Sequence, residues 1–81
     1  MTEHPQEEEK EYLELAEHYF SLHPKWSALE IMESIEGEHP KLDSKLKELY
    51  KKEEMTDSEI TSGLIGIVYE AKSNKKKLVK V

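Results

Sequence analysis

The sequence contains neither cysteine nor arginine. Without cysteine, the chain has no disulfide, no thiol nucleophile and no thiolate ligand for a metal, and nothing marks it for an oxidising compartment. Without arginine, it lacks the guanidinium group that recognises guanine edges, phosphates and carboxylates through two hydrogen bonds. The absence of arginine disfavours base-reading DNA proteins and phosphoryl-transfer enzymes, and the absence of cysteine favours a cytoplasmic location.

Long hydrophobic runs are also absent. The longest apolar run, residues 64–69, is interrupted by Gly66 and is far shorter than a membrane-spanning helix requires. The first nine residues contain four glutamates and no lysine, whereas a signal peptide begins with a basic segment followed by an apolar one. We therefore expect neither membrane insertion nor secretion.

Positive charge is scarce in the first half of the chain. Residues 1–38 contain eleven acidic residues and two lysines, a net charge of −9, whereas residues 39–81 carry +3. The total of −6 disfavours electrostatic binding to phosphate backbones or anionic lipids, since that binding requires positive charge. We therefore do not expect nucleic acid as a partner, and we interpret the lysines at positions 72, 75, 76, 77 and 80 as a solvated tail.

The chain is long enough for one small domain with a thin core, and its helix-start signals divide it into four segments. All three prolines follow a histidine, at positions 4–5, 23–24 and 39–40, and proline is favoured in the first turn of a helix. Residues 56–59, Thr-Asp-Ser-Glu, have the pattern of a capping box. These signals predict an all-α bundle of four short helices, at about 5–22, 24–36, 40–54 and from 57 onward. They lie in a single domain, residues 1–81, whose ends at 1–5 and 74–81 we expect to be flexible.

Apolar residues recur at helical spacing in every segment, which defines the predicted core. The core positions are Tyr12, Leu13, Leu15, Ala16, Tyr19, Phe20 and Leu22 in the first segment, Ala28, Ile31, Met32 and Ile35 in the second, Leu42, Leu46, Leu49 and Tyr50 in the third, and Ile60, Leu64, Ile67, Val68 and Ala71 in the fourth. Gly37 is expected to end the second helix, because glycine commonly follows a helix C-terminus.

The last segment also fits a β-hairpin. Gly63 and Gly66 each cost roughly 1 kcal/mol inside a helix, and Ile65 and residues 67–69 are of types that favour strands. A hairpin within residues 63–81 would turn the three preceding helices into a winged helix. The capping box and the regular spacing of the helix starts favour the fourth helix.

The stretch from Tyr12 to Ile35, with the pairs Leu15-Ala16, Tyr19-Phe20 and Glu30-Ile31, covers less than a third of the chain. It resembles the first two helices of the winged-helix domain in the delta subunit of bacterial RNA polymerase. The resemblance implies a winged fold and a role in transcription. The aromatic and arginine-rich wing of that family has no counterpart, because residues 63–81 contain Tyr69 as their only aromatic residue and no arginine.

No residue pattern points to catalysis, a cofactor or a metal. Three of the four histidines belong to the His-Pro pairs, and none has the spacing of a zinc site. The glutamates of residues 7–17 share the solvent face of one predicted helix, whereas paired catalytic carboxyls face each other across a cleft. The serines and glycines form neither a nucleophile elbow nor a phosphate-binding loop. We therefore expect no enzymatic activity and no cofactor.

Six residues are candidates for contact with a partner protein: Glu11, Glu14, Glu17, Trp26, Ile65 and Tyr69. The glutamates belong to an acidic helix face that suits a basic partner. Trp26 lies opposite the apolar stripe of its segment, so it either covers the end of the first helix or is available to a partner. Ile65 and Tyr69 lie opposite the stripe of the fourth segment, which predicts an interface with another chain, most simply a homodimer.

The leading hypothesis is a non-enzymatic, acidic helical module with an interaction or regulatory role, which acts by binding another protein. One alternative is a winged-helix regulator that contacts DNA or RNA polymerase through the lysine-rich C-terminal segment. A second alternative is an acidic nucleic-acid mimic that inhibits a nucleic-acid-binding protein.

Overall fold

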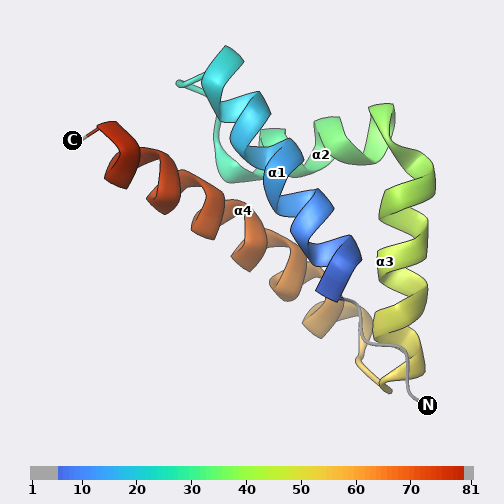
Figure 1. The fold of residues 1–81 in the computed structure, drawn as a ribbon. Coiled ribbons are helices and arrows are strands. Elements are labelled where there is room, and N and C mark those ends of the chain that lie inside the picture. The colour runs from blue at the N-terminus through green and yellow to red at the C-terminus, as the bar shows by residue number, and fades with distance from the viewer. Residues whose placement is uncertain (1–5, 80–81) are drawn as a thin grey trace.

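The computed structural model describes residues 6–79, with side chains through Asn74, and contains four helices (Figure 1). Helix α1 spans Gln6–Leu22, α2 spans Ala28–Glu38, α3 spans Pro40–Lys52 and α4 spans Asp57–Val79. The described residues contain no strand, so the predicted four-helix bundle is confirmed, and the winged helix with a hairpin in residues 63–81 is wrong. Of the ends predicted to be flexible, residues 1–5 and 80–81 lie outside the described residues, and residues 74–79 belong to α4.

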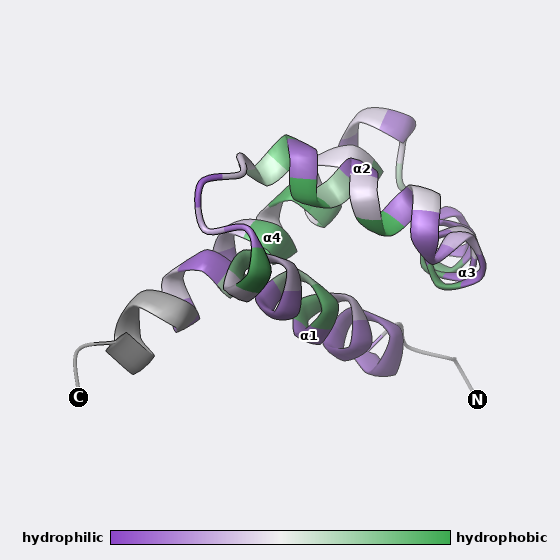
Figure 2. Ribbon diagram, turned by 90° about the horizontal axis from the view of Figure 1, so that it is seen from above, coloured by the Kyte–Doolittle hydropathy of each residue, from purple (hydrophilic) through white to green (hydrophobic). Residues whose placement is uncertain are grey.

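Helices α1 and α4 run side by side in the same general direction and form the most extensive helix contact of the fold (Figure 1). Helix α2 crosses behind α1 in the view of Figure 1 and contacts it, and α3 lies at the end where α1 and α4 begin (Figure 2). A helix of 23 residues is about 34 Å long. Helix α4 therefore accounts for the longest of the overall dimensions, which are 40 × 25 × 20 Å.

The core consists mainly of the predicted apolar stripes. Its buried residues are Tyr12, Ala16, Tyr19, Phe20, Ala28, Ile31, Ile35, Leu46, Tyr50, Ile60, Leu64, Val68 and Ala71. The predicted core residues Leu13, Leu15, Met32, Leu42 and Ile67 are half-buried against this cluster, and Leu49 is buried. Leu22 departs from the prediction and is 58% exposed, because it is the last residue of α1 and no later turn covers it.

Helix α2 begins at Ala28, four residues later than predicted. The prediction that the second His-Pro pair starts a helix is therefore wrong. His23 and Pro24 belong to a turn in which the Trp26 N–H donates to the His23 carbonyl at 3.0 Å. The helix is instead capped by Ser27, whose side chain accepts from the Glu30 N–H at 3.2 Å. The Glu30 carboxylate accepts in return from the Ser27 N–H at 3.3 Å. This capping box satisfies two free N–H groups, which a proline alone does not.

His39 is the entire connection between α2 and α3. Its N–H donates to the Ile35 carbonyl at 2.8 Å, and its carbonyl accepts from the Asp43 N–H at 3.1 Å. Pro40 occupies the first turn of α3, as predicted from the third His-Pro pair. Helix α2 continues through Gly37, which has no positive φ, so the prediction that this glycine ends the helix is wrong. The hydrogen bond from His39 closes the last turn without a left-handed residue.

Helix α3 ends two residues earlier than predicted, in a turn built around Glu54. This residue has a φ of 64°, in the left-handed region that usually selects glycine or asparagine. The Glu54 N–H donates to the Lys51 carbonyl at 2.9 Å, and the Met55 N–H donates to the Tyr50 carbonyl at 3.2 Å. These two bonds form a Schellman motif, which satisfies carbonyl groups at the helix end. Because glutamate is atypical at this position, the sequence contains no signal for the turn.

Helix α4 begins at the predicted capping box. The Thr56 side chain accepts from the Glu59 N–H at 3.2 Å, and the Glu59 carboxylate accepts from the Thr56 N–H at 2.8 Å. The helix then continues without interruption through Gly63 and Gly66. Those glycines cost about 1 kcal/mol each in helix propensity, and burial of the apolar face of α4 against the other three helices outweighs that cost.

Asp43 is an acidic residue inside the bundle, only 3% exposed, that the apolar pattern did not indicate. One of its carboxylate oxygens lies 2.9 Å from the Lys47 ammonium group, which also reaches Glu36 on α2 at 3.2 Å. The hydrogen bond to Asp43, followed by that to Glu36, raises the pKa of Lys47, and burial opposes the shift. Lys47 therefore links α3 to α2 and supplies the positive charge that a buried carboxylate needs.

Three tyrosine hydroxyls on α1 and α3 have different environments. The Tyr19 hydroxyl donates to Glu38, and the Tyr50 hydroxyl donates to Glu9. The Tyr12 hydroxyl is buried and has no hydrogen-bond partner among the described residues. A buried donor without a partner loses its water contacts and gains nothing in return. The hydroxyl of Tyr12 should therefore destabilise the fold, whereas those of Tyr19 and Tyr50 should stabilise it.

We expect Tyr12→Phe to leave the free energy of unfolding unchanged or to raise it by up to about 1 kcal/mol, because it removes a buried hydroxyl without a partner. Tyr50→Phe should lower the free energy of unfolding by about 1 to 2 kcal/mol, because it removes the bond to Glu9. Urea unfolding followed by circular dichroism measures both values. If Tyr12→Phe proves the more destabilising of the two, the assignment is wrong.

Candidate functional site

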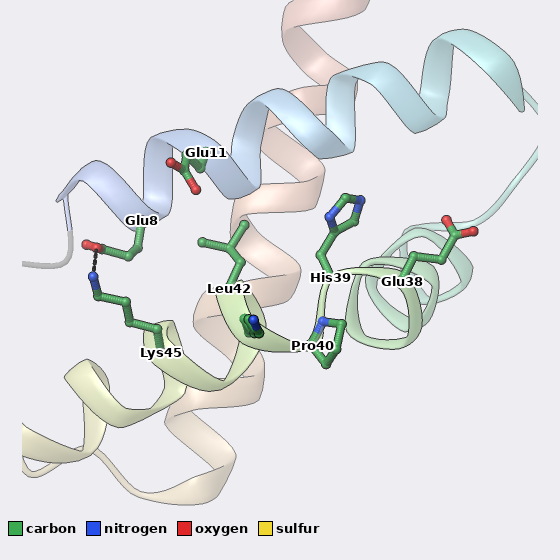
Figure 3. Close-up of a pocket in the computed structure, with 8 residues that line it drawn as sticks. Glu8, Glu11, Glu38, His39, Pro40, Leu42 and Lys45 are labelled. Carbon is green, nitrogen blue, oxygen red and sulfur yellow. Dashed lines mark ion pairs between the residues drawn. The ribbon is translucent and has the colours of Figure 1, made fainter.

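The surface is hollowed between α1 and the corner where α2 meets α3 (Figure 3). One section has a volume of about 570 Å³ and is lined by Glu8, Glu11, Glu38, His39, Pro40, Lys41, Leu42 and Lys45. A second section of about 350 Å³ shares Glu11, His39 and Leu42 with the first and adds Glu14 and Leu15. Because the two sections share three residues, we treat them as one site, the α1–α3 groove. Its size falls within the range of binding pockets.

The helices position the two walls of the α1–α3 groove. On α1, Glu8, Glu11 and Leu15 are spaced by three and four residues, which places them on one face of the helix. On the other wall, Leu42 and His39 point toward α1 (Figure 3). His39 forms the corner between α2 and α3 without any loop, and α1 crosses this corner (Figure 3). The hollow lies at this crossing.

An ion pair joins the two walls of the groove. The Lys45 ammonium group on α3 lies 3.1 Å from the Glu8 carboxylate on α1 (Figure 3). The hydrogen bond with Lys45 is the main cause that lowers the pKa of Glu8. Because the lysine side chain is 63% exposed, the pair contributes little to stability.

The corner of the groove is connected to the core through Tyr19. The hydroxyl of this tyrosine donates to the carboxylate of Glu38, which lines the groove. Burial, assisted by the hydrogen bond to Glu38, raises the pKa of Tyr19 to about 12. The ring of His39 lies 6.5 Å from the ring of Tyr19 in an edge-to-face arrangement. Tyr19 thus holds both corner residues in place.

Glu11 and Glu14 differ from Glu8 and Glu38, the other two glutamates that line the α1–α3 groove, which bond to Lys45 and Tyr19. Glu11 and Glu14 are both exposed, and neither makes a hydrogen bond or ion pair within the described residues. They lie beside Leu15 and Leu42, which are half-buried and form the apolar floor of the groove. The groove therefore combines apolar surface with two carboxylates that the fold itself does not use.

Of the six candidate partner-binding residues, the structure brings Glu11 and Glu14 together in the groove. Glu17 lies elsewhere and is half-buried, and it accepts a hydrogen bond from the Asn74 side chain on α4 at 3.3 Å. Trp26 is also half-buried: its ring stacks on His23, with centroids 3.7 Å apart, and lies 6.4 Å from the Tyr19 ring. Trp26 therefore covers the end of α1, one of the two roles considered for it, and its contact with a partner stays a prediction.

The two candidates on α4 have different environments. Ile65 is half-buried and packs against the core cluster, which differs from the expectation that it lies opposite the core. Because all three other helices contact α4, its buried surface is wider than the single stripe used for the prediction. Tyr69 is 58% exposed, as expected for a residue on the outer face. The two therefore do not form one exposed patch.

Of the ten residues that line the groove, sequence reasoning identified Glu11 and Glu14 and missed the other eight, among them Leu15, Leu42 and His39. Leu15 and Leu42 were assigned to the core, and His39 was interpreted as part of a helix start. Each assignment holds in part, because the leucines contact the core and His39 precedes α3. These residues meet only because α1 crosses the corner between α2 and α3, and helical periodicity contains no information about such a crossing.

The groove offers contacts and no obvious reaction. Catalysis by paired carboxyls requires one desolvated carboxyl, whereas Glu11 and Glu14 are both exposed. Within residues 6–79, no group of three or more histidine, aspartate or glutamate side chains could hold a metal ion. No helix among these residues is long and apolar enough to cross a membrane. Comparisons with protein families, curated proteins and solved structures give no match to this chain.

The stability of the fold should fall as pH rises above about 10. Burial raises the pKa of Tyr12, Tyr19 and Tyr50 above the ordinary value of 10.0. In the unfolded chain these hydroxyls lose their protons near pH 10.0, whereas in the folded chain they keep them to a higher pH, about 12 for Tyr19. The free energy of unfolding therefore has its full value below pH 10.0 and falls as the pH rises through the folded-state pKa. The raised pKa of Lys47 likewise lowers the free energy of unfolding as the pH rises above 10.5, the ordinary pKa of lysine.

Urea unfolding at about pH 8 and at about pH 11 tests this dependence. The free energy of unfolding should be lower at the higher pH. The difference between the two pH values should be smaller for Tyr19→Phe than for the wild type, because the variant lacks one of the responsible hydroxyls. An equal stability at both pH values would contradict the burial of these hydroxyls.

Proposed function

We propose that the protein is a non-enzymatic interaction module that binds a segment of another protein in the α1–α3 groove. The observation that carries this proposal is the combination, in one hollow, of the half-buried Leu15 and Leu42 with the exposed Glu11 and Glu14. Apolar surface in a groove provides affinity when water leaves it, and polar groups at its rim fix the orientation of the ligand. A module of this kind acts by occupying its partner, which suits a regulatory role in the cytoplasm.

The two alternative functions have less support. A winged-helix regulator requires the hairpin that α4 replaces. An acidic nucleic-acid mimic requires negative charge alone, and the leucines in the groove would then have no part in binding. Variants of the leucines and of the glutamates therefore separate an interaction module from a mimic.

The test compares two leucine variants in affinity capture from extracts of the native host. Leu42→Ser removes part of the groove floor, and Leu29→Ser is the matched control, because Leu29 is 53% exposed on α2 and does not line the groove. A partner captured by the wild type and by Leu29→Ser should bind Leu42→Ser at least about tenfold more weakly. Circular dichroism confirms that both variants remain helical.

Equal binding of the partner to wild type, Leu29→Ser and Leu42→Ser would exclude the groove as the docking site. If that binding is lost on replacement of Glu11 and Glu14 by glutamine, the protein acts as an acidic mimic. If the glutamate variant also binds equally, the partner uses another surface.

A homodimer through the outer face of α4 is a second candidate, and it is separate from the groove. The observation in its favour is Tyr69, which is 58% exposed although the large apolar residues at positions 60, 64 and 68 of the same helix are buried. Large aromatic residues are enriched at protein interfaces, and association adds buried surface to a small core. Ile65 packs partly in the core, so replacing it would damage the monomer as well as a dimer.

Tyr69→Ser is therefore the variant that tests the dimer. Leu22→Ser is a matched control, because Leu22 is also 58% exposed and lies at the end of α1. Sedimentation at micromolar concentration should give a dimer for the wild type and for Leu22→Ser, and a monomer for Tyr69→Ser. A monomeric wild type would refute the dimer.

A further inference from the structure

The chemistry of the partner segment can be inferred from the lining of the α1–α3 groove, and this inference rests on the proposed function. The section around the leucine floor contains two carboxylates, one imidazole and no lysine. Both sections together contain four glutamates and two lysines. One of these lysines, Lys45, already pairs with Glu8 at 3.1 Å. The groove thus has an excess of negative charge, concentrated at Glu11 and Glu14.

The placement of this charge determines what can cover it. Glu11 and Glu14 are separated by three residues, so their carboxylates lie on the same side of α1, next to Leu15. A partner that seats an apolar side chain on Leu15 and Leu42 also takes water away from the neighbouring carboxylates. Burying a carboxylate without a counter-charge is costly, whereas a cation beside it offsets the cost. A neutral or acidic partner segment is therefore disfavoured.

The secondary structure of the partner segment can be inferred from the secondary structure of the groove walls. All the walls are helical, and the described residues contain no strand to which an extended peptide could add by backbone hydrogen bonds. A helix satisfies its own backbone groups and can offer apolar and charged side chains on adjacent faces. We propose that the partner segment is a cationic amphipathic helix, whose apolar face packs on Leu15 and Leu42 and whose lysine or arginine side chains pair with Glu11 and Glu14.

The experiment uses three synthetic helical peptides of equal length and the whole protein. The first peptide has leucine on one face and lysine on the adjacent positions, the second replaces every lysine by glutamate, and the third replaces every leucine by serine. Binding is measured by nuclear magnetic resonance titration, with the methyl signals of Leu15 and Leu42 as reporters. The first peptide should bind and shift both signals, and the other two should bind at least about tenfold more weakly.

Two double variants separate a specific site from general attraction to an acidic protein. Glu11→Gln with Glu14→Gln removes the groove carboxylates, and Glu33→Gln with Glu48→Gln makes the same change in net charge at exposed positions that do not line the groove. The groove variant should bind the lysine–leucine peptide about tenfold more weakly than the wild type, and the control variant less than about twofold more weakly.

Equal weakening in both double variants would overturn the proposal, because the peptide would then respond only to net charge. Equal or tighter binding of the glutamate peptide would also overturn it. In either case the proposed function stands if capture of the host partner still depends on Leu42. If that capture does not depend on Leu42, the proposed function itself fails, whatever the peptides do.

Discussion

The pairing of α1 with α4 is the contact on which the rest of the bundle depends, because it joins the first and last helices of the described residues. These are also the two longest helices, so their contact closes a loop that contains α2 and α3. Loop closure costs conformational entropy, and the apolar surface buried between the two helices offsets that cost. Where the two helices approach their C-termini, the Asn74 side chain on α4 donates to the Glu17 carboxylate on α1 at 3.3 Å.

Given this pairing, α2 and α3 have to bring the chain from the C-terminal end of α1 back to its N-terminal end, where α4 begins (Figure 1). The turn at His39 achieves this without a loop, since one residue ends α2 and precedes α3. The position of α1 is set by α4, and the position of the corner is set by that turn. Leu15 and Leu42 are half-buried where α1 crosses this corner, and the groove lies there.

Local patterns predicted most of the fold, and they did not predict features that depend on competition or on tertiary contacts. Apolar spacing and the Thr56 capping box correctly predicted four helices. The His23-Pro24 pair was misinterpreted because the capping box of Ser27 competes with it for the helix start. The turn at Glu54 had no signal, since its left-handed conformation is imposed by the chain on either side. The burial of Ile65 depends on three other helices, which one helical projection cannot represent.

The acidic face of α1 shows why the site was only partly predictable. Its glutamates look equivalent in the sequence, yet Glu8, Glu9 and Glu17 bond to side chains on α3 and α4 that are far away in the chain. Among the described residues, Glu11 and Glu14 have no such partner, and both lie in the groove beside its leucines, whereas Glu7 also has none and does not line the groove. The fold thus uses part of the acidic face to hold its own helices together. Because the unused carboxylates lie beside the leucine floor, the same helix face supplies both the apolar contact and the charge that selects the partner.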